Sequence, residues 1–224
     1  MSHSTTHRPV RTFHGRSGRL GPTSTAAIAD LSPRYGITLS DASLLGSVND
    51  PRPVIVEIGS GMGEATAAMA AADPDTVIVA TEVHTAGVAA LLRRVDHDGL
   101  DNVRVMHADG VEVLQRMVEP ASLAGVRMFF PDPWPKARHH KRRLVRPDLM
   151  ALTAERIRPG GTLHAATDWG EYADQMLTVL AAQPLLRNEF DGFAPRPSWR
   201  PVTRFEAKGM RQGHPIHDLL FRRV

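Results

Sequence analysis

The chain has 224 residues, 42% of them hydrophobic, and contains no cysteine. This size suits a single domain with a buried sheet, and the lack of thiols excludes disulfides, thiolate metal sites and a cysteine nucleophile, which fits a cytoplasmic location. The formal net charge is only +3, but the pI of about 9.8 and the local clustering of Arg and Lys favour a polyanion as partner.

Residues 1–24 are predicted to form a flexible basic N-terminal arm. They are rich in Ser, Thr, Gly and His, carry Arg8, Arg11, Arg16 and Arg19, and show no apolar periodicity. Basic arms contact nucleic acid in some proteins and are plain disordered termini in others, and both alternatives stay open. The arm lacks the apolar core of a signal peptide, and no later stretch is long enough to span a bilayer, so no membrane association is expected.

Residues 25–224 are predicted to form one α/β domain. From Pro53 onward, short apolar runs alternate with amphipathic segments, a pattern typical of βαβ units and of a mostly parallel sheet with helices on both faces. Strands are expected at 54–58, 76–81, 103–108, 126–130 and 162–167. Helices are expected at 64–72, 85–96, 110–118, 147–158 and 169–182, the fourth ending at a turn over 159–161. The closing section should hold a proline-rich loop, a short helix near Thr203 and a strand at 216–221.

A glycine-rich turn follows the first expected strand. It runs from Glu57 to Glu64 and contains Gly59, Gly61 and Gly63, so the backbone bends tightly and a ligand can approach closely. A dinucleotide fingerprint would place glycine where Glu64 stands, and this carboxylate would repel a pyrophosphate. The turn therefore disfavours NAD and FAD. It favours S-adenosylmethionine, whose positive charges Glu57 can attract.

Two further acids end the second and third expected strands. Glu82 lies 19 residues after Gly63, where an acid accepts hydrogen bonds from ribose hydroxyls. Asp109 can accept from an adenine amino group while the N–H of Gly110 meets a ring nitrogen. Each acid by itself is more commonly a strand terminus or a helix cap. Together, in this order and spacing, they predict a cofactor site.

The fourth expected strand runs into Pro131-Asp132-Pro133-Trp134-Pro135-Lys136. Ligands of open α/β sheets bind outside the carboxyl ends of strands, so this loop should face the transferred methyl group. Three prolines stiffen it, Trp134 offers a ring, and Asp132 is the acid held there. The alternative is a rigid surface turn with a packed tryptophan.

A dense cationic segment comes next. Charge runs are usually solvated surface, but this one adjoins the presumed methyl donor, which favours phosphate binding and hence a nucleic-acid substrate. Its candidate phosphate ligands are Lys136, Arg138, Lys141, Arg142 and Arg143.

Five motifs resemble the bacterial tRNA (guanine-N7)-methyltransferase family. They are Glu-x-Gly-x-Gly-x-Gly, Pro-Asp-Pro-Trp-Pro-Lys, Arg-His-x-Lys-Arg-Arg-Leu, Ala-Thr-Asp-Trp and Thr-x-Phe-Glu, which span Pro53 to the C-terminus. Arg11-Thr12-Phe13 and Gly18-Arg19 are similar to that family's N-terminal arm. The resemblance implies a Rossmann-like class I methyltransferase with a seven-stranded sheet. It also implies methylation of the tRNA variable loop, at the position conventionally numbered 46.

The resemblance also assigns residues to the two ligands. The cofactor region would be contacted by Glu57, Glu82, Asp109 and Asp132, and the substrate by Lys136, Asp168, Thr203, Arg204, Phe205 and Glu206. Asp168 with Glu171, and Thr203 with Glu206, also fit capping boxes, a role that does not exclude reading guanine. His214 and His217 have ligand-like spacing without a further ligand, so no metal is assigned.

Guanine N7 carries a lone pair and no proton, so its methylation needs no general base. Asp132 is therefore expected to orient the reactants and act electrostatically. Two alternatives remain: methylation of an exocyclic amino group, or a catalytically silent tRNA-binding subunit. The bacterial-type resemblance implies that the chain needs no obligatory protein partner, as a monomer or a homodimer.

Overall fold

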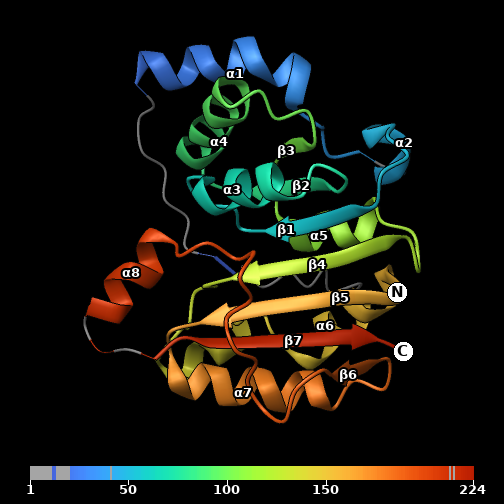
Figure 1. The fold of residues 1–224 in the computed structure, drawn as a ribbon, viewed down its shortest axis with the longest axis vertical. Helices are drawn as coiled ribbons and strands as arrows, with labels where there is room; N and C mark the ends of the chain where they lie inside the picture. Colours follow the sequence, from blue (N-terminus) through green and yellow to red (C-terminus); the bar gives the residue numbers. More distant parts are fainter. Residues whose placement is uncertain (1–11, 14–20, 41, 212, 214) are drawn as a thin grey trace, which may run out of the picture.

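The structure is a computed structural model that describes residues 12–13, 21–40, 42–211, 213 and 215–224, apart from the side chains of residues 204, 205 and 208. A seven-stranded sheet crosses the molecule in the order β3-β2-β1-β4-β5-β7-β6 (Figure 1). The first five strands pair in parallel, and β7 runs antiparallel to β5 and β6. The strands are β1 Val54–Ile58, β2 Val77–Glu82, β3 Val103–His107, β4 Leu123–Phe129, β5 Ile157–Thr167, β6 Leu186–Asn188 and β7 His217–Arg223.

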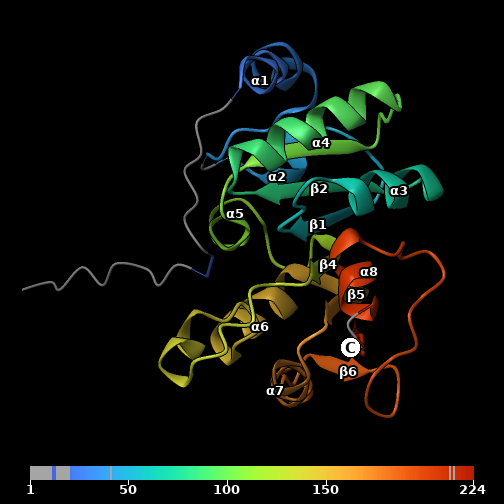
Figure 2. The same ribbon diagram turned by 90° about the vertical axis from the view of Figure 1, so that its left-hand side faces the viewer.

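Helices cover both faces of the sheet. On one face lie α3 (Glu64–Ala72) and α4 (Thr85–His97), with α1 (Pro22–Tyr35) packed on α4. The other face is covered by α2 (Leu44–Val48), α5 (Gly110–Arg116), α6 (Pro147–Arg156) and α7 (Gly170–Ala181). Figure 2 shows α5 and α6 on one side of the strands, and α3 and α8 (Arg204–Arg211) on the other. The predicted doubly covered, mostly parallel sheet is confirmed.

Successive residues of one strand belong to the two opposite cores. In β2, which is buried throughout, Val77 and Val79 face the α5 to α7 layer, whereas Ile78 and Ala80 face α3 and α4. Side chains alternate across a strand, so a parallel strand with both faces covered needs apolar residues at every position. This requirement explains the continuous apolar runs of the sequence.

Several predicted boundaries are wrong. Helix α1 begins at Pro22, inside the segment assigned to the arm, and neither α1 nor α2 nor β6 was predicted. The turn expected over 159–161 lies within β5, which starts at Ile157 and pairs with Leu123; the register then shifts until Gly125 pairs with Thr162. The intervening residues bulge outward, since Arg158, Pro159 and Gly160 are exposed. Glycine and proline therefore mark a strand irregularity here rather than a connection between elements.

Candidate active site

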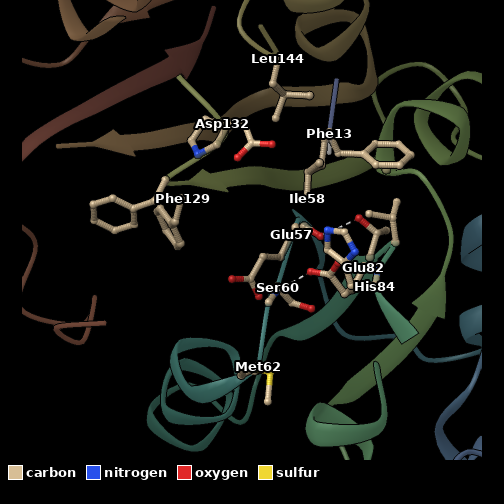
Figure 3. A pocket seen from close by; sticks show the side chains of 18 of the residues that line it. Phe13, Glu57, Ile58, Ser60, Met62, Glu82, His84, Phe129, Asp132 and Leu144 are labelled. Carbon is tan, nitrogen blue, oxygen red and sulfur yellow. Dashed lines mark hydrogen bonds between the residues drawn. The ribbon is translucent and has the colours of Figure 1, made fainter. Parts of the chain in front are cut away.

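A cavity of about 370 Å³ opens at the carboxyl ends of β1 to β4. Figure 3 shows side chains from several elements pointing into it, with Glu57, Ser60 and Glu82 on one side and Asp132 and Phe129 on another. Its size suits a ligand of cofactor dimensions. The predicted residues that line it are Glu57, Gly59, Gly61, Gly63, Glu82, Asp109, Asp132 and Thr203.

The glycine turn has the backbone that its sequence requires. Gly59, Gly61 and Gly63 have φ values of +80°, +58° and +77°, a region that side-chain-bearing residues rarely adopt. A Cβ on Gly63 would lie only 2.5 Å from Cδ1 of Leu91 on α4. The third glycine therefore serves close helix packing as well as turn geometry, and the three glycines present only backbone to the cavity.

Glu82 is fixed by the backbone around it. One carboxylate oxygen accepts the N–H of Gly61 at 2.8 Å, and the other accepts the N–H of His84 at 2.7 Å. These bonds tie the end of β2 to the glycine turn. Each carboxylate oxygen can accept a second hydrogen bond, so the group still suits ribose hydroxyls.

Glu57 is almost fully buried, with 3% of its surface exposed. Burial raises the pKa of its carboxyl group, while a 2.6 Å hydrogen bond from Thr66 Oγ1 and the nearby Arg127 guanidinium favour the charged form. A buried carboxylate is costly unless a positive group compensates it. The site is therefore suited to a cationic ligand group such as an ammonium.

Asp109 is a helix cap, which is a more common role than ligand binding for a single acid at the end of a strand. Its Oδ1 accepts the N–H of Val111 at 2.9 Å and so caps α5, and burial raises the pKa of its carboxyl group. The residue also lines the cavity beside Gly110. Capping thus holds the carboxyl group at the place where an adenine amino group was expected.

Trp134 is packed, with 4% of its surface exposed. Its indole N–H donates to the carbonyl oxygen of Thr12 at 3.2 Å, and the Arg142 guanidinium lies 4.9 Å from the ring centroid. The residue holds φ at +45°, a strained value for a tryptophan. The ring therefore joins the N-terminal segment to the proline loop and is not open for stacking on a base.

The cationic segment divides into exposed and buried members. The exposed ones, on or next to the 3₁₀ helix η1 (Ala137–Arg142), are Lys136, Arg138, Lys141 and Arg142. The prediction that Arg143 is a phosphate ligand is corrected, because this residue is fully buried. Its guanidinium donates to the Pro133 carbonyl at 2.9 Å and to Glu171 and Gln175 on α7. Arg143 braces the proline loop and is not placed to bind phosphate.

The two predicted capping boxes have different outcomes. Thr203 Oγ1 accepts the N–H of Glu206 at 3.0 Å and the Glu206 carboxylate accepts the N–H of Thr203 at 3.4 Å, so this box is confirmed. For Asp168 the prediction is wrong, because α7 begins at Gly170 with Trp169 as its N-cap and Glu171 binds Arg143.

The substrate candidates of the closing section are differently placed. Asp168 lies against α8, where a Cβ on Gly209 would be 3.2 Å from its Oδ2. The prediction that Glu206 reads guanine is also corrected, because the residue is 1% exposed and its carboxylate accepts hydrogen bonds from Arg200. The side chains of Arg204 and Phe205, and His214, lie outside the described residues, so those assignments stay predictions.

Other residues of the site were not predicted. Thr12, Phe13, His84 and Leu144 line the cavity. A buried ionic cluster lies beside it, in which the predicted residue Glu206 is joined by three residues that were not predicted, Arg200, Asp218 and His164. A sequence signal existed for two members, since His164 and Asp218 interrupt apolar strands at inward positions and buried polar groups require partners.

Comparison with known proteins identifies the family. Residues 51–219 match the family described as "Putative methyltransferase". The tRNA (guanine-N(7)-)-methyltransferase of Nitrosospira multiformis is 47% identical, covering 97% of this chain and 96% of that protein. Its counterpart from Burkholderia vietnamiensis is 50% identical, over 97% and 86%.

The chain belongs to this methyltransferase family. Solved structures agree at the level of the fold. The 16S rRNA methyltransferase KamB has a TM-score of 0.54 at 14% identity, covering 93% of this chain and 97% of that one. SMU.1697c of Streptococcus mutans, solved in complex with SAH, has a TM-score of 0.52 at 11% identity, over 78% and 90%.

The described residues contain neither a candidate membrane span nor a candidate metal site. No helix among them has both the length and the apolar character needed to cross a membrane. Within the same residues, no three acidic or histidine side chains gather as a metal site, and the ring of His217 packs against Phe193 with centroids 4.5 Å apart.

Proposed function

We propose that this methyltransferase transfers a methyl group from S-adenosylmethionine to N7 of guanine in tRNA, in the variable loop at the position conventionally numbered 46. The proposal rests on one observation: residues suited to bind the cofactor and residues suited to bind a nucleic acid lie at the same cavity. Carboxylates of Glu57, Glu82 and Asp109 lie on the sheet side, and Asp132 lies on the loop that leads into exposed cations. The relatives named tRNA (guanine-N(7)-)-methyltransferase support the same reaction.

The residues present fit the cofactor. We assign Glu57 to its ammonium group, Glu82 to its ribose hydroxyls and Asp109 to its adenine amino group; these assignments are supported by the position of all three acids in the cavity lining and by the glycine turn, which leaves room for close approach. Bound there, S-adenosylmethionine supplies an electrophilic methyl group on a sulfonium. The buried surroundings of Glu57 strengthen its attraction for positive charge.

Asp132 acts on the reacting base by position and charge. Guanine N7 attacks with its lone pair and has no proton to lose, so no base is needed. The purine gains positive charge as the new bond forms, and a carboxylate at the cavity wall stabilises that charge. Holding the reacting atoms in line supplies much of the rate.

The rest of the substrate is held by charge. Lys136, Arg138, Lys141 and Arg142 are exposed beside Asp132 and are suited to tRNA phosphates, and Thr203 and Asp168 to the base region. The protein acts without an obligatory partner subunit, as a monomer or homodimer, in the cytoplasm.

Nucleoside mass spectrometry tests the proposal. Unmodified tRNA is incubated with the protein and S-adenosylmethionine, next to a matched tRNA whose guanine at the proposed position is replaced by adenine. N7-methylguanosine should form in the first tRNA and not in the second. A methylated exocyclic amine would assign the chain to amino-group chemistry, and tRNA binding without product would make it a silent RNA-binding subunit. Either result overturns the proposal.

A further inference from the structure

A fully buried arginine joins three parts of the substrate side. Arg200 lies in the loop before α8 and has 0% of its surface exposed. Its Nε and Nη2 donate to the two carboxylate oxygens of Asp218 on β7, both at 2.8 Å. Its Nη1 and Nη2 donate to Glu206 on α8 at 2.6 and 3.1 Å. One planar guanidinium therefore binds two carboxylates from different elements.

The Glu206 contact reaches the cavity through the capping box. Glu206 accepts the N–H of Thr203, and Thr203 Oγ1 caps the helix in return. Thr203 itself lines the cavity. By fixing the Glu206 carboxylate, Arg200 fixes where α8 begins and thus where Thr203 stands.

The Arg200 guanidinium also lies near the turn that carries Asp132. The rings of Phe129 and Phe130 lie 5.8 Å from the Arg200 guanidinium carbon, and both rings line the cavity. Phe130 has φ of +51° and leads directly into Pro131-Asp132. Strained backbone persists only where its surroundings hold it. Arg200 is part of those surroundings.

Asp218 is in turn held from the sheet. His164 on β5 contacts its Oδ1 with Nε2 at 2.7 Å. Strand β7 pairs with β5 over Thr167↔His217 to Thr162↔Arg222, so this anchor belongs to the hydrogen-bonded sheet. The chain of contacts runs from sheet to Asp218, to Arg200, to Glu206 and then to Thr203.

The energetic character of this cluster indicates a geometric role. Buried ion pairs stabilise a fold little or not at all compared with well-packed apolar residues, because desolvation offsets their attraction. A guanidinium nevertheless fixes its partners in direction and spacing, since its donors form a rigid planar fork. Apolar residues in this place would fill the same volume without setting the orientation of α8.

We propose that Arg200 is a positioning residue for methyl transfer, which holds the start of α8, with Thr203, in register with the Phe130–Asp132 turn across the substrate side of the cavity. The inference rests on the proposed function. In this role Arg200 organises the substrate side of the cavity, whereas recognition of the cofactor depends on Glu57, Glu82 and Asp109.

The variant Arg200→Lys tests this role. Lysine keeps the charge but cannot donate in the forked geometry to both carboxylates. The kcat for tRNA methylation should fall about 100-fold, the loss expected from a misplaced reacting group, while the Kd for S-adenosylhomocysteine changes less than about 3-fold. Hydrogen exchange of the α8 amides, 204–211, should become faster. A loss of cofactor affinity as large as the loss of kcat would overturn the proposal, as would unchanged kcat and unchanged α8 exchange.

Two further variants keep the test decisive. Arg222→Lys is the matched control, because Arg222 on β7 also pairs with a carboxylate, that of Glu189, but is partly exposed and does not line the cavity. It should leave kcat and α8 exchange unchanged, and a loss equal to that of Arg200→Lys would contradict a specific role.

If Arg200→Lys does not fold, Asp218→Asn removes the anchor alone, with an expected fall in kcat of about 10-fold and the same cofactor affinity. An unchanged kcat in folded Asp218→Asn overturns the proposal. If the unaltered protein methylates no tRNA, the proposed function fails, and α8 exchange still decides whether Arg200 anchors the helix.

Discussion

The two sides of the cavity are held in place by different means. On the cofactor side, Glu57 is the penultimate residue of β1, Glu82 is the last residue of β2, and backbone N–H groups hold the Glu82 carboxylate directly. On the substrate side, the proline loop and α8 are held by the buried Arg143 and Arg200. The geometry of the cofactor side therefore follows from the sheet itself, whereas the geometry of the substrate side depends on ion pairs that connect loops to the sheet.

Removing Asp132 should have the largest effect on catalysis and should separate the two sides. We expect Asp132→Ala to lower kcat for tRNA methylation by about 100- to 1000-fold, the range for loss of one preorganised electrostatic group. The Kd for S-adenosylhomocysteine, measured by calorimetry, should change far less, because the cofactor-side acids remain. Equal losses of kcat and cofactor affinity would show that the two sides are not independent. Asp132→Asn is the control, because it keeps the shape of the side chain and removes only its negative charge.

Substituting Gly63 in the glycine turn of the cofactor side should lower the stability of the fold. Gly63→Ala forces a strained φ and a clash with Leu91, so its free energy of unfolding should fall by about 2–4 kcal/mol. The matched variant is Gly59→Ala, where φ is also positive but nothing lies within 4 Å of the new Cβ, and the expected loss is about 1–2 kcal/mol. Urea unfolding without cofactor measures both values. Equal losses would refute the packing role of Gly63.

Cofactor binding should depend on pH through Glu57. Burial raises the pKa of this carboxyl group in the unliganded protein, so more of it is protonated as pH falls. A ligand ammonium prefers the carboxylate, so affinity for S-adenosylhomocysteine should rise with pH and weaken on acidification. Glu57→Gln should lower affinity by about 10-fold at neutral pH and flatten this dependence, since a charge-assisted hydrogen bond contributes about 1.5–3 kcal/mol. If the affinity of Glu57→Gln depended on pH as that of the unaltered protein does, Glu57 would not be the residue that binds the ammonium group.

The smallest effect is expected from the exposed cations. Lys141→Gln should weaken tRNA binding by about 3- to 10-fold and reduce the slope of log K against log salt by about 0.7–0.9, as for one lost phosphate contact. Fluorescence anisotropy over a salt series measures both. Arg93→Gln on α4 is the exposed control and should leave the slope unchanged. If Lys141→Gln also leaves the slope unchanged, Lys141 does not contact phosphate.

The fold and the cofactor side could largely be predicted from the sequence because both rest on local patterns. Apolar runs mark buried strands, and Glu57, Glu82 and Asp109 each stand at or just after a strand end, where parallel topology brings them together. Helix α1 was not predicted, because its opening Pro-Thr-Ser-Thr resembles a loop, although proline suits the first helical turn.

The substrate side could be predicted less well because its contacts are distant in sequence. Nothing local distinguishes Arg143, which is buried, from Arg142, which is exposed. Arg143 depends on α7 and Arg200 on β7, partners 28 and 18 residues away. A cationic segment predicts affinity for polyanions, but which of its members face water is decided only by tertiary packing.

The position of β7 has a consequence for the order in which the enzyme is completed during synthesis. It follows the other described strands in sequence, yet it lies between β5 and β6 and carries Asp218, the anchor of Arg200. The strands of the cofactor side leave the ribosome before it, and folding during synthesis proceeds from the N-terminal side. A nascent chain can therefore bring the strands of its cofactor cavity together first, while α8 has no anchor until β7 emerges. We expect the protein to be able to hold its methyl donor before it can position an RNA.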